Sequence, residues 1–292
     1  MHIFLLLLGC ISVSSSAVFV NLSDLPSLAL IVYRLFFACL LMLPYLLLKH
    51  RTEFFHIETK TALLIALNGV FFAVHLLTFF ESLRYTGIAE ANMLMCTEVL
   101  FIAVYEWLFK KLKISWKGWL CLIIALIAAY FVITGRNVSA NDVQRSASEY
   151  LKGNALATAS AIFSALYTLV GRRVRKSVSM PVYTFNLYLV ALLIALSALL
   201  LRGVPLFGYA VRNVWLALGM SLATTIMGHN MFSLGLKYLK ASVVSSMKLT
   251  VPVFGAVLAY IVFGQVPGLQ VIVASAVLLL SIASYIRVEK RD

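Results

Sequence analysis

Two residues of opposite charge, Glu98 and Lys248, lie deep inside long apolar stretches of the chain. If such a stretch crosses a bilayer, a charge at its centre costs about 2.5–3.5 kcal/mol on insertion scales, so the side chain must face protein or water. A carboxylate and an ammonium can form a structural salt bridge, bind the two ends of a zwitterion, or stay solvated in a wet space. We expect Glu98 and Lys248 to meet or to share a cavity, and the sequence leaves these three roles open.

Histidine, amide and phenol side chains supply a second group of candidates. His75 in GVFFAVHLLTFF and His229 in ATTIMGHNMFSL each lie near the middle of an apolar stretch, and Asn230 follows the second histidine. A histidine changes charge near neutral pH, which allows a role in proton coupling, although an embedded histidine also makes hydrogen bonds between helices. Both interpretations stay open. Asn92 and Tyr167 complete the residues that we expect around the cavity.

Tyr33, Arg34 and Pro252 suit structural or gating roles. Arg34 lies next to Tyr33 in the first two turns of its apolar stretch, from where it can reach the outer interface or pair with an acid. Pro252 lies near the centre of another apolar stretch. A proline there lacks one backbone N–H, which kinks a helix and can form a hinge.

The composition places these residues in a membrane protein. The chain has 292 residues, of which 62% are hydrophobic and 12% charged, whereas soluble domains are about half apolar and a quarter charged. Backbone polar groups in lipid must be satisfied within their own segment, so apolar runs of about twenty residues are helices. The sequence predicts an all-α polytopic protein with ten transmembrane helices, at residues 2–20, 28–48, 62–83, 88–109, 117–135, 153–171, 181–201, 214–237, 241–263 and 267–286.

The ten predicted helices divide into two similar halves. LRYTGIAEANMLMCTEVLFIAVYEWLF and LKYLKASVVSSMKLTVPVFGAVLAYIVF share a charged turn, a small-residue helix start, a central polar break and an aromatic and aliphatic run. A shift of 154 residues also places His75 on His229. We predict a first five-helix repeat at 1–135, a polar linker at 136–152 and a second repeat at 153–292. Because five is odd, the second repeat must be inverted relative to the first.

The basic residues predict the orientation of the helices. With the N-terminus inside, the inner loops hold sixteen of the 24 Lys and Arg residues and the outer loops hold six, which favours a cytoplasmic location for both termini. The net charge of +13 is explained by these short basic caps beside lipid headgroups, so we expect no nucleic-acid partner. The four cysteines lie in apolar runs without metal or redox spacing, and we expect neither a metal nor a cofactor.

Two motifs resemble a known family. The pair Tyr33 and Arg34 followed by LFFACLLMLP, and the more specific run YLKASVVSSMKLTVPVFGAVLAYIVFGQ, are similar to the EamA family of the drug/metabolite transporter superfamily, over nearly the whole chain. The resemblance implies ten helices in two inverted repeats around a central cavity, and export of small metabolites such as amino acids. The chain departs from the family pattern in two respects. Glu98 stands where the family has a proline in the fourth helix, and Lys111 and Gln265 stand where it has acidic residues.

A secondary transporter is the function that these features favour. The chain lacks the GxxxxGK[ST] loop of ATP-driven systems and the HExxH, GxSxG or Asp-rich motifs of membrane-embedded enzymes. A channel or a scaffold would not need an inverted repeat with ionisable groups at its centre. We expect the substrate to be amino acids or related compounds, exported by alternating access. Nucleoside-like cofactors and organic cations are the alternatives.

The predicted partners are a small-molecule substrate, the lipid bilayer and protons as a coupling ion. The sequence leaves the direction of transport, the coupling ion and the oligomeric state open. Compact loops and the lack of a targeting extension favour the bacterial inner membrane as the location.

Overall fold

The computed structural model describes residues 2–110, 114–134, 146–238, 248 and 250–289. Within these ranges the regular structure is entirely helical, and no strand occurs. The all-α class predicted from the sequence is therefore confirmed. The basic residues predicted for some loops, such as Lys111, Lys113 and Lys240, and most of the predicted linker at 136–152 lie outside the described residues.

Helices follow most of the predicted spans. Six helical spans in the described part of the chain are long and apolar enough to cross a membrane, and three further apolar helices are shorter. Runs of this kind form helices in lipid because each backbone N–H finds its acceptor within the same segment. The elements are α1 (His2–Leu22), α2 (Ser27–Lys49), α3 (Arg51–Phe55), α4 (Thr59–Ser82), α5 (Ile88–Met95), α6 (Glu98–Lys110), α7 (Trp116–Thr134), α8 (Ala147–Val174), α9 (Met180–Leu201), α10 (Val211–Met220), the π-helix η1 (Ser221–His229), α11 (Asn230–Tyr238), α13 (Val251–Phe263) and α14 (Leu269–Glu289).

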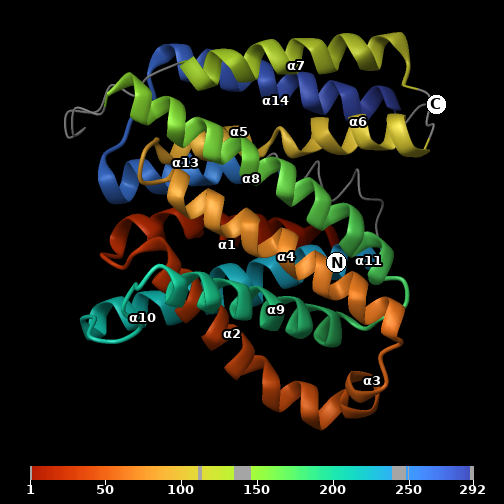
Figure 1. Cartoon of the computed structure of the whole chain (residues 1–292). Helices are drawn as coiled ribbons and strands as arrows, with labels where there is room; N and C mark the ends of the chain where they lie inside the picture. The colour runs from red at the N-terminus through yellow and green to blue at the C-terminus, as the bar shows by residue number, and fades with distance from the viewer. Residues whose placement is uncertain (1, 111–113, 135–145, 239–247, 249, 290–292) are drawn as a thin grey trace.

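The two halves of the chain interleave in one bundle. The helices lie side by side, with α7 and α14 packed together along one edge and α2 and α3 at the opposite edge (Figure 1). Between these edges, α4 of the first half packs against α8 and α9 of the second, and α1 packs against η1 and α13. Gly69 on α4 permits one of these contacts, because a Cβ atom at this position would lie 2.6 Å from Val190. The core therefore lies between the halves rather than within either one.

The fourth predicted span, 88–109, is broken. Helix α5 ends at Met95 and α6 begins at Glu98, with a turn at Cys96 and Thr97. In that turn the amide of Thr97 donates to the carbonyl oxygen of Leu94, 3.1 Å away, so the bond spans three residues instead of four. The predicted span is confirmed in its extent, as Ile88–Phe109, but its α-helical bonding is interrupted at this turn. The break places Glu98 in the first turn of α6, next to the positive end of the helix dipole.

The ninth span contains a related boundary. Helix α13 begins at Val251, directly after a turn residue at Thr250, and Pro252 lies in its first turn. Proline is tolerated at this position because the first amides of a helix have no intrahelical acceptor. Most of the predicted span before α13 lies outside the described residues, and the kink or hinge expected at Pro252 stays a prediction. A shift of 154 residues places Cys96 on Thr250, so the two halves have helix boundaries at equivalent positions.

The eighth predicted span, 214–237, contains a π-helix. Helix α10 continues into η1, which ends at His229, and then into α11 without a loop. Bonds in a π-helix span five residues instead of four, and such segments in α-helices are frequent at functional sites. The apolar pattern of this stretch did not indicate the change.

The sixth helix begins earlier than predicted. Helix α8 starts at Ala147 rather than 153, because Ser146 and Glu149 form a reciprocal cap. The amide of Glu149 donates to the hydroxyl oxygen of Ser146 at 3.3 Å, and the amide of Ser146 donates to the carboxylate of Glu149 at 2.8 Å. The last residues of the predicted polar linker therefore belong to a transmembrane helix.

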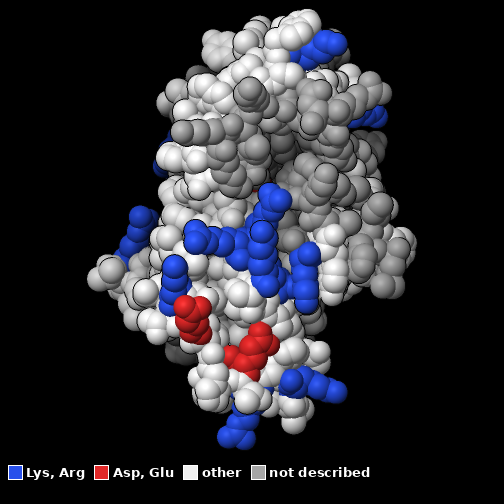
Figure 2. All heavy atoms as spheres, turned by 90° about the vertical axis from the view of Figure 1, so that its right-hand side faces the viewer, with Lys and Arg blue, Asp and Glu red and all other residues white. Residues whose placement is uncertain are grey.

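Contacts between turns show that the two halves are inverted. The amide of Ser179, in the turn after the first helix of the second half, donates to the carboxylate of Glu53, after the second helix of the first half, at 2.6 Å. At the opposite end of the bundle, Asp24 follows the first helix of the first half and Asn213 follows the second helix of the second half. The amide of Asp24 donates to the side-chain oxygen of Asn213 at 3.3 Å. Turns that follow the first helix in one half and the second helix in the other share a side only in an inverted repeat. Lys and Arg side chains gather on the face of the molecule where the helices end on the α3 side, which is the right-hand side of Figure 1 (Figure 2).

Candidate functional site

A buried ion pair joins the broken fourth span to the ninth. The ammonium of Lys248 lies 2.9 Å from Oε1 and 3.1 Å from Oε2 of Glu98. Glu98 comes from the first turn of α6, and Lys248 lies three residues before α13. The sequence-based expectation that these two residues meet is confirmed, and their role stays a prediction.

Helix α8 supplies two more donors to the same carboxylate. The hydroxyl of Ser164 donates to Oε2 of Glu98, and the hydroxyl of Thr168 donates to Oε1, both at 2.7 Å. Ser164 and Thr168 are four residues apart, so both side chains lie on one face of α8. Both oxygens of Glu98 thus accept a hydroxyl and the ammonium of Lys248. A buried carboxylate in this setting is well compensated.

The two partners of the pair differ in their exposure. The side chain of Glu98 is 5% exposed, whereas that of Lys248 is 21% exposed. The ammonium also lies 5.5 Å from the centroid of the Phe232 ring, within the range of a cation–π contact. Lys248 is therefore the partner that a solute or water reaches first.

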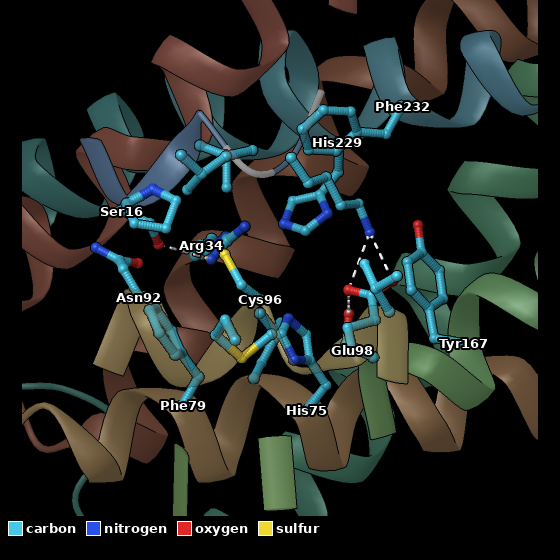
Figure 3. A pocket seen from close by; sticks show the side chains of 18 residues that line it. Ser16, Arg34, His75, Phe79, Asn92, Cys96, Glu98, Tyr167, His229 and Phe232 are labelled. Atoms are coloured by element: carbon cyan, nitrogen blue, oxygen red, sulfur yellow. Dashed lines mark hydrogen bonds and ion pairs between the residues drawn. The ribbon is translucent and has the colours of Figure 1, made fainter. Parts of the chain in front are cut away.

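The pair forms part of the wall of a cavity of about 90 Å³. Polar and aromatic side chains from both halves converge on it (Figure 3). The lining residues are Val13, Ser16, Arg34, His75, Leu76, Phe79, Asn92, Met95, Cys96, Glu98, Val99, Ser164, Tyr167, His229, Phe232, Lys248, Val251 and Pro252. Eight of the ten residues singled out in the sequence line this cavity, the exceptions being Tyr33 and Asn230.

The two histidines occupy different surroundings although they are equivalent in the repeat. His75 is held by Ser160 of α8, whose hydroxyl lies 2.8 Å from its Nδ1. His229 makes no hydrogen bond among the described residues, and its ring packs edge-on against Phe72 at a centroid distance of 5.2 Å. The structure therefore favours a helix-to-helix contact for His75 and leaves His229 available to a ligand.

Arg34 lies in the cavity wall and is fully buried. Its Nε donates to the hydroxyl of Thr225 in η1 at 2.7 Å, and one terminal nitrogen donates to Ser16 at 3.5 Å. The guanidinium also lies 5.6 Å from the centroid of the Phe80 ring. The expectation that Arg34 reaches the outer interface is wrong, and no acid within the described part of the chain pairs with it. Arg34 is held instead by hydroxyl groups.

Asn92 and Tyr167 line the cavity from opposite halves of the chain. Asn92 on α5 is buried and lies against α13, where Gly255 leaves the space for its amide. Tyr167 on α8 is also buried, and its ring lies 5.1 Å from that of Phe72. Both placements agree with the expectation from the sequence, and neither residue is thereby assigned a role.

Asn230 and Tyr33 lie outside the cavity. The side-chain oxygen of Asn230 accepts a hydrogen bond from the Tyr188 hydroxyl at 2.9 Å, which ties α11 to α9. The hydroxyl of Tyr33 donates to the carbonyl oxygen of Leu206 at 2.8 Å, in the turn that follows α9. These contacts favour a structural role for both residues.

Sequence reasoning missed two groups that complete the site. Thr168 was not singled out, and Ser16 and Ser164 were not among the residues assigned to the cavity, because small residues in a helix suit close packing as well as a polar pocket. The signal that could have found Thr168 is its spacing of four residues from Ser164 on a helix that also carries Tyr167. Across the described residues, no group of three His, Cys, Asp or Glu side chains is placed to hold a metal ion.

Comparisons with known proteins agree with this architecture. A model of the EamA-like transporter family matches residues 1–134 and 151–287. An uncharacterized transporter of Clostridium kluyveri is 22% identical over 206 residues, which cover 70% of this chain and 65% of that protein. One solved crystal structure resembles the fold with a TM-score of 0.69 and 14% sequence identity, over 99% of this chain and 96% of that one.

The family match falls on both halves of the chain. One matched range spans α1 to α7, and the other begins in the second turn of α8 and ends two residues before the end of α14. The crystal structure supports the fold alone because its sequence identity is low. The resemblance seen in the motifs is confirmed, and this multi-pass membrane protein with two EamA repeats belongs to the EamA-like transporter family.

Proposed function

We propose that this protein is a secondary transporter that moves small metabolites by alternating access around the cavity of Glu98 and Lys248. The best candidates for the substrate are amino acids or related compounds, moved in the export direction. The cavity lies where the two inverted repeats meet, which is where transporters of this architecture bind their substrates.

The observation that carries the proposal is the ion pair between the two repeats. Glu98 belongs to the first half and Lys248 to the second, and their charged atoms are 2.9 Å apart. When one repeat rocks against the other, a contact between them at the centre must change. A pair whose ammonium is partly exposed can exchange a protein partner for water or for a solute.

The cavity favours some substrates over others. Its described lining contains two cations, Arg34 and Lys248, and one carboxylate, Glu98. An organic cation would meet an excess of positive charge in a medium of low dielectric constant, which costs several kcal/mol. The net positive charge of the described lining therefore disfavours organic cations as substrates. The rings of Phe79, Tyr167 and Phe232 suit a solute with an apolar or aromatic body.

Protons are the coupling ion that the site can accommodate. His229 lines the cavity without a hydrogen-bond partner among the described residues, and an imidazole accepts or releases a proton near neutral pH. We propose His229 rather than His75 for this role, because His75 already bonds Ser160.

The orientation that we propose places both termini and the α3 end in the cytoplasm, most simply in a bacterial inner membrane. The exposed basic residues Lys49, Arg51 and Lys60 lie at the α3 end, as the positive-inside rule expects. Single cysteines in place of Lys60 and Arg173 should react with a membrane-impermeant reagent from one side of the membrane, and a cysteine in place of Arg212 from the other. If the cysteines in place of Lys60 and Arg173 are labelled from different sides of the membrane, the proposed topology is wrong.

Transport in proteoliposomes tests the function. A panel of labelled amino acids and related acids is offered with and without an imposed proton gradient, and accumulation is measured. Glu98→Gln and Lys248→Met are expected to lower flux at least tenfold, whereas the exposed controls Glu58→Gln and Lys60→Met keep it. Normal flux and substrate affinity in folded Glu98→Gln and Lys248→Met would refute the role of the pair.

A further inference from the structure

One donor of Arg34 is buried without an acceptor. Its side chain is 0% exposed, and the terminal nitrogen Nη2 has no hydrogen-bond partner in the part of the chain that the structure describes. The other two nitrogens are fixed by Thr225 and Ser16, so the guanidinium cannot simply turn away. An unmet donor on a buried charged group is costly. A buried donor of this kind needs an explanation, and its position in a cavity wall suits a ligand that accepts from it.

The charges around the cavity point to the chemistry of that ligand. Glu98 is neutralised by Lys248 and by two hydroxyl groups, which leaves the positive charge of Arg34 uncompensated among the described lining residues. Charged side chains inside a membrane are almost always paired. The missing partner is therefore an anion.

His229 offers a second donor near the same position. In Figure 3 its imidazole lies between the guanidinium of Arg34 and the carboxylate of Glu98, and no described residue forms a hydrogen bond with it. The hydroxyl of Ser16 lies on the other side of the guanidinium and already contacts it at 3.5 Å. A planar carboxylate can accept from Arg34 and from an imidazole N–H at once.

We propose that Arg34, with His229 as a second donor, is a subsite for the carboxylate of the transported solute, and that the solute is a monocarboxylate with an apolar body. This inference rests on the proposed function and narrows its substrate class. The body of the solute lies against Phe79, Cys96 and Phe232, which line the same cavity. An ammonium group on the solute is not required, because the carboxylate of Glu98 is already occupied.

A matched set of ligands tests the charge preference on the unmodified protein. Binding of 3-phenylpropanoate, 3-phenylpropanamide, phenylalanine and 2-phenylethylamine to the purified protein is measured by titration calorimetry and by the shift of the melting midpoint. The expected order places the carboxylate about 10- to 100-fold tighter than the neutral amide, with phenylalanine weaker than the carboxylate and the amine weakest. Equal or tighter binding of the amine or the amide would overturn the proposal, and so would equal competition by inorganic phosphate.

Variants then assign the effect to Arg34. Arg34→Lys keeps the charge but loses the fork of donors, and it should weaken 3-phenylpropanoate binding about tenfold or more. The exposed Arg51→Gln serves as the control and should bind as the unmodified protein does. If Arg34→Lys fails to fold, two variants that keep the arginine replace it. Ser16→Ala and His229→Gln are each expected to weaken the binding of 3-phenylpropanoate several-fold. Unchanged carboxylate affinity in folded Arg34→Lys would overturn the assignment.

Failure of the subsite and failure of the transport function give different results. Carboxylate binding that depends on Arg34, in a protein that transports no solute in proteoliposomes, would support the subsite and refute the transporter proposal. Transport of amines or neutral solutes that Arg34→Lys does not change would support the transporter and refute the subsite.

Discussion

His75 and Ser160 hold each other through a reciprocal pair of hydrogen bonds. Nδ1 of His75 lies 3.2 Å from the carbonyl oxygen of Ser160, and the hydroxyl of Ser160 donates to the carbonyl oxygen of His75 at 2.9 Å. The pair joins α4 of the first half to α8 of the second. Its repeat equivalent, His229, has no such partner among the described residues, so the symmetry of the sequence does not extend to the bonding of the two imidazoles.

Variants at Ser160 and at His229 should therefore separate stability from transport. Ser160→Ala is expected to lower stability by about 0.5–1.5 kcal/mol, since an interhelical hydrogen bond in a membrane contributes about that much. His229→Gln should leave the melting midpoint within a degree or two and lower proton-driven flux several-fold. Thermal unfolding in detergent and flux in proteoliposomes measure the two effects. A large stability loss in His229→Gln with normal flux would reverse the assignment.

The pair of Glu98 and Lys248 should show strong coupling in a double-mutant cycle. Removing one partner leaves a buried charge alone, which costs about 3–5 kcal/mol for a fully buried pair. The side chain of Lys248 is 21% exposed and that of Glu98 is 5% exposed. Lys248→Met leaves the more deeply buried charge, Glu98, without its partner, so it should be the more damaging single change. The double variant Glu98→Gln with Lys248→Met should recover much of the loss. Melting midpoints of the four proteins provide the measurement, and strict additivity would show that the two charges do not depend on each other.

Gly255 should accept a larger side chain only if Asn92 or a helix moves. A Cβ atom at Gly255 would lie 2.4 Å from Nδ2 of Asn92, so Gly255→Ala must push α13 away from α5 or displace the amide. Such overpacking costs about 1–3 kcal/mol. The double variant Gly255→Ala with Asn92→Ala should recover most of that stability. If Asn92→Ala brings no recovery, the steric contact is not the cause of the loss.

The contact between Glu53 and Ser179 predicts a dependence of stability on pH. Partial burial raises the pKa of the Glu53 carboxyl, but hydrogen bonds from Ser179 and the neighbouring His50 outweigh it, so the pKa lies below its ordinary value. A carboxyl whose pKa is lower in the folded state stabilises the protein above the unfolded pKa, and the contribution is lost as the pH falls through the folded pKa. Because the side chain of Glu53 is 34% exposed, the contribution is at most about 1 kcal/mol.

The matching experiment compares Glu53→Gln with the unmodified protein at two pH values. Glu53→Gln should melt at a lower temperature at pH 7, and the difference should disappear near pH 3. The exposed Glu58→Gln is the control and should show no difference at either pH. A difference that grows on acidification would contradict the direction of the shift.

The main features of the fold could be predicted from the sequence because they depend on length and polarity. Apolar runs of twenty residues must be helices in lipid, and an odd number of them per repeat requires inversion. The meeting of Glu98 with Lys248 was predictable because an isolated charge in such a run needs a partner. These inferences use one residue or one stretch at a time.

The details of the site depend on neighbours that no single stretch contains. The helix break before Glu98 and the π-helix that ends at His229 are changes of backbone bonding, which the apolar pattern of a stretch does not specify. Arg34 was expected to reach the outer interface or to pair with an acid, because a long charged side chain usually extends to water or finds an opposite charge. Thr225 and Ser16 hold it inside instead, and both come from other helices. The different environments of His75 and His229 likewise follow from Ser160, because none of the residues that the structure describes plays the same part for His229.

The π-helix η1 gives α11 a rotational freedom that an ordinary helix lacks. Each residue of an α-helix turns the chain by about 100°, and a π-turn accommodates one residue more than an α-turn. If η1 changed to α-helical bonding, α11 would therefore rotate about its own axis, and no loop would have to open. Phe232, whose ring faces the ammonium of Lys248, would be carried round with it. The ring and the charge would separate through a change of winding alone.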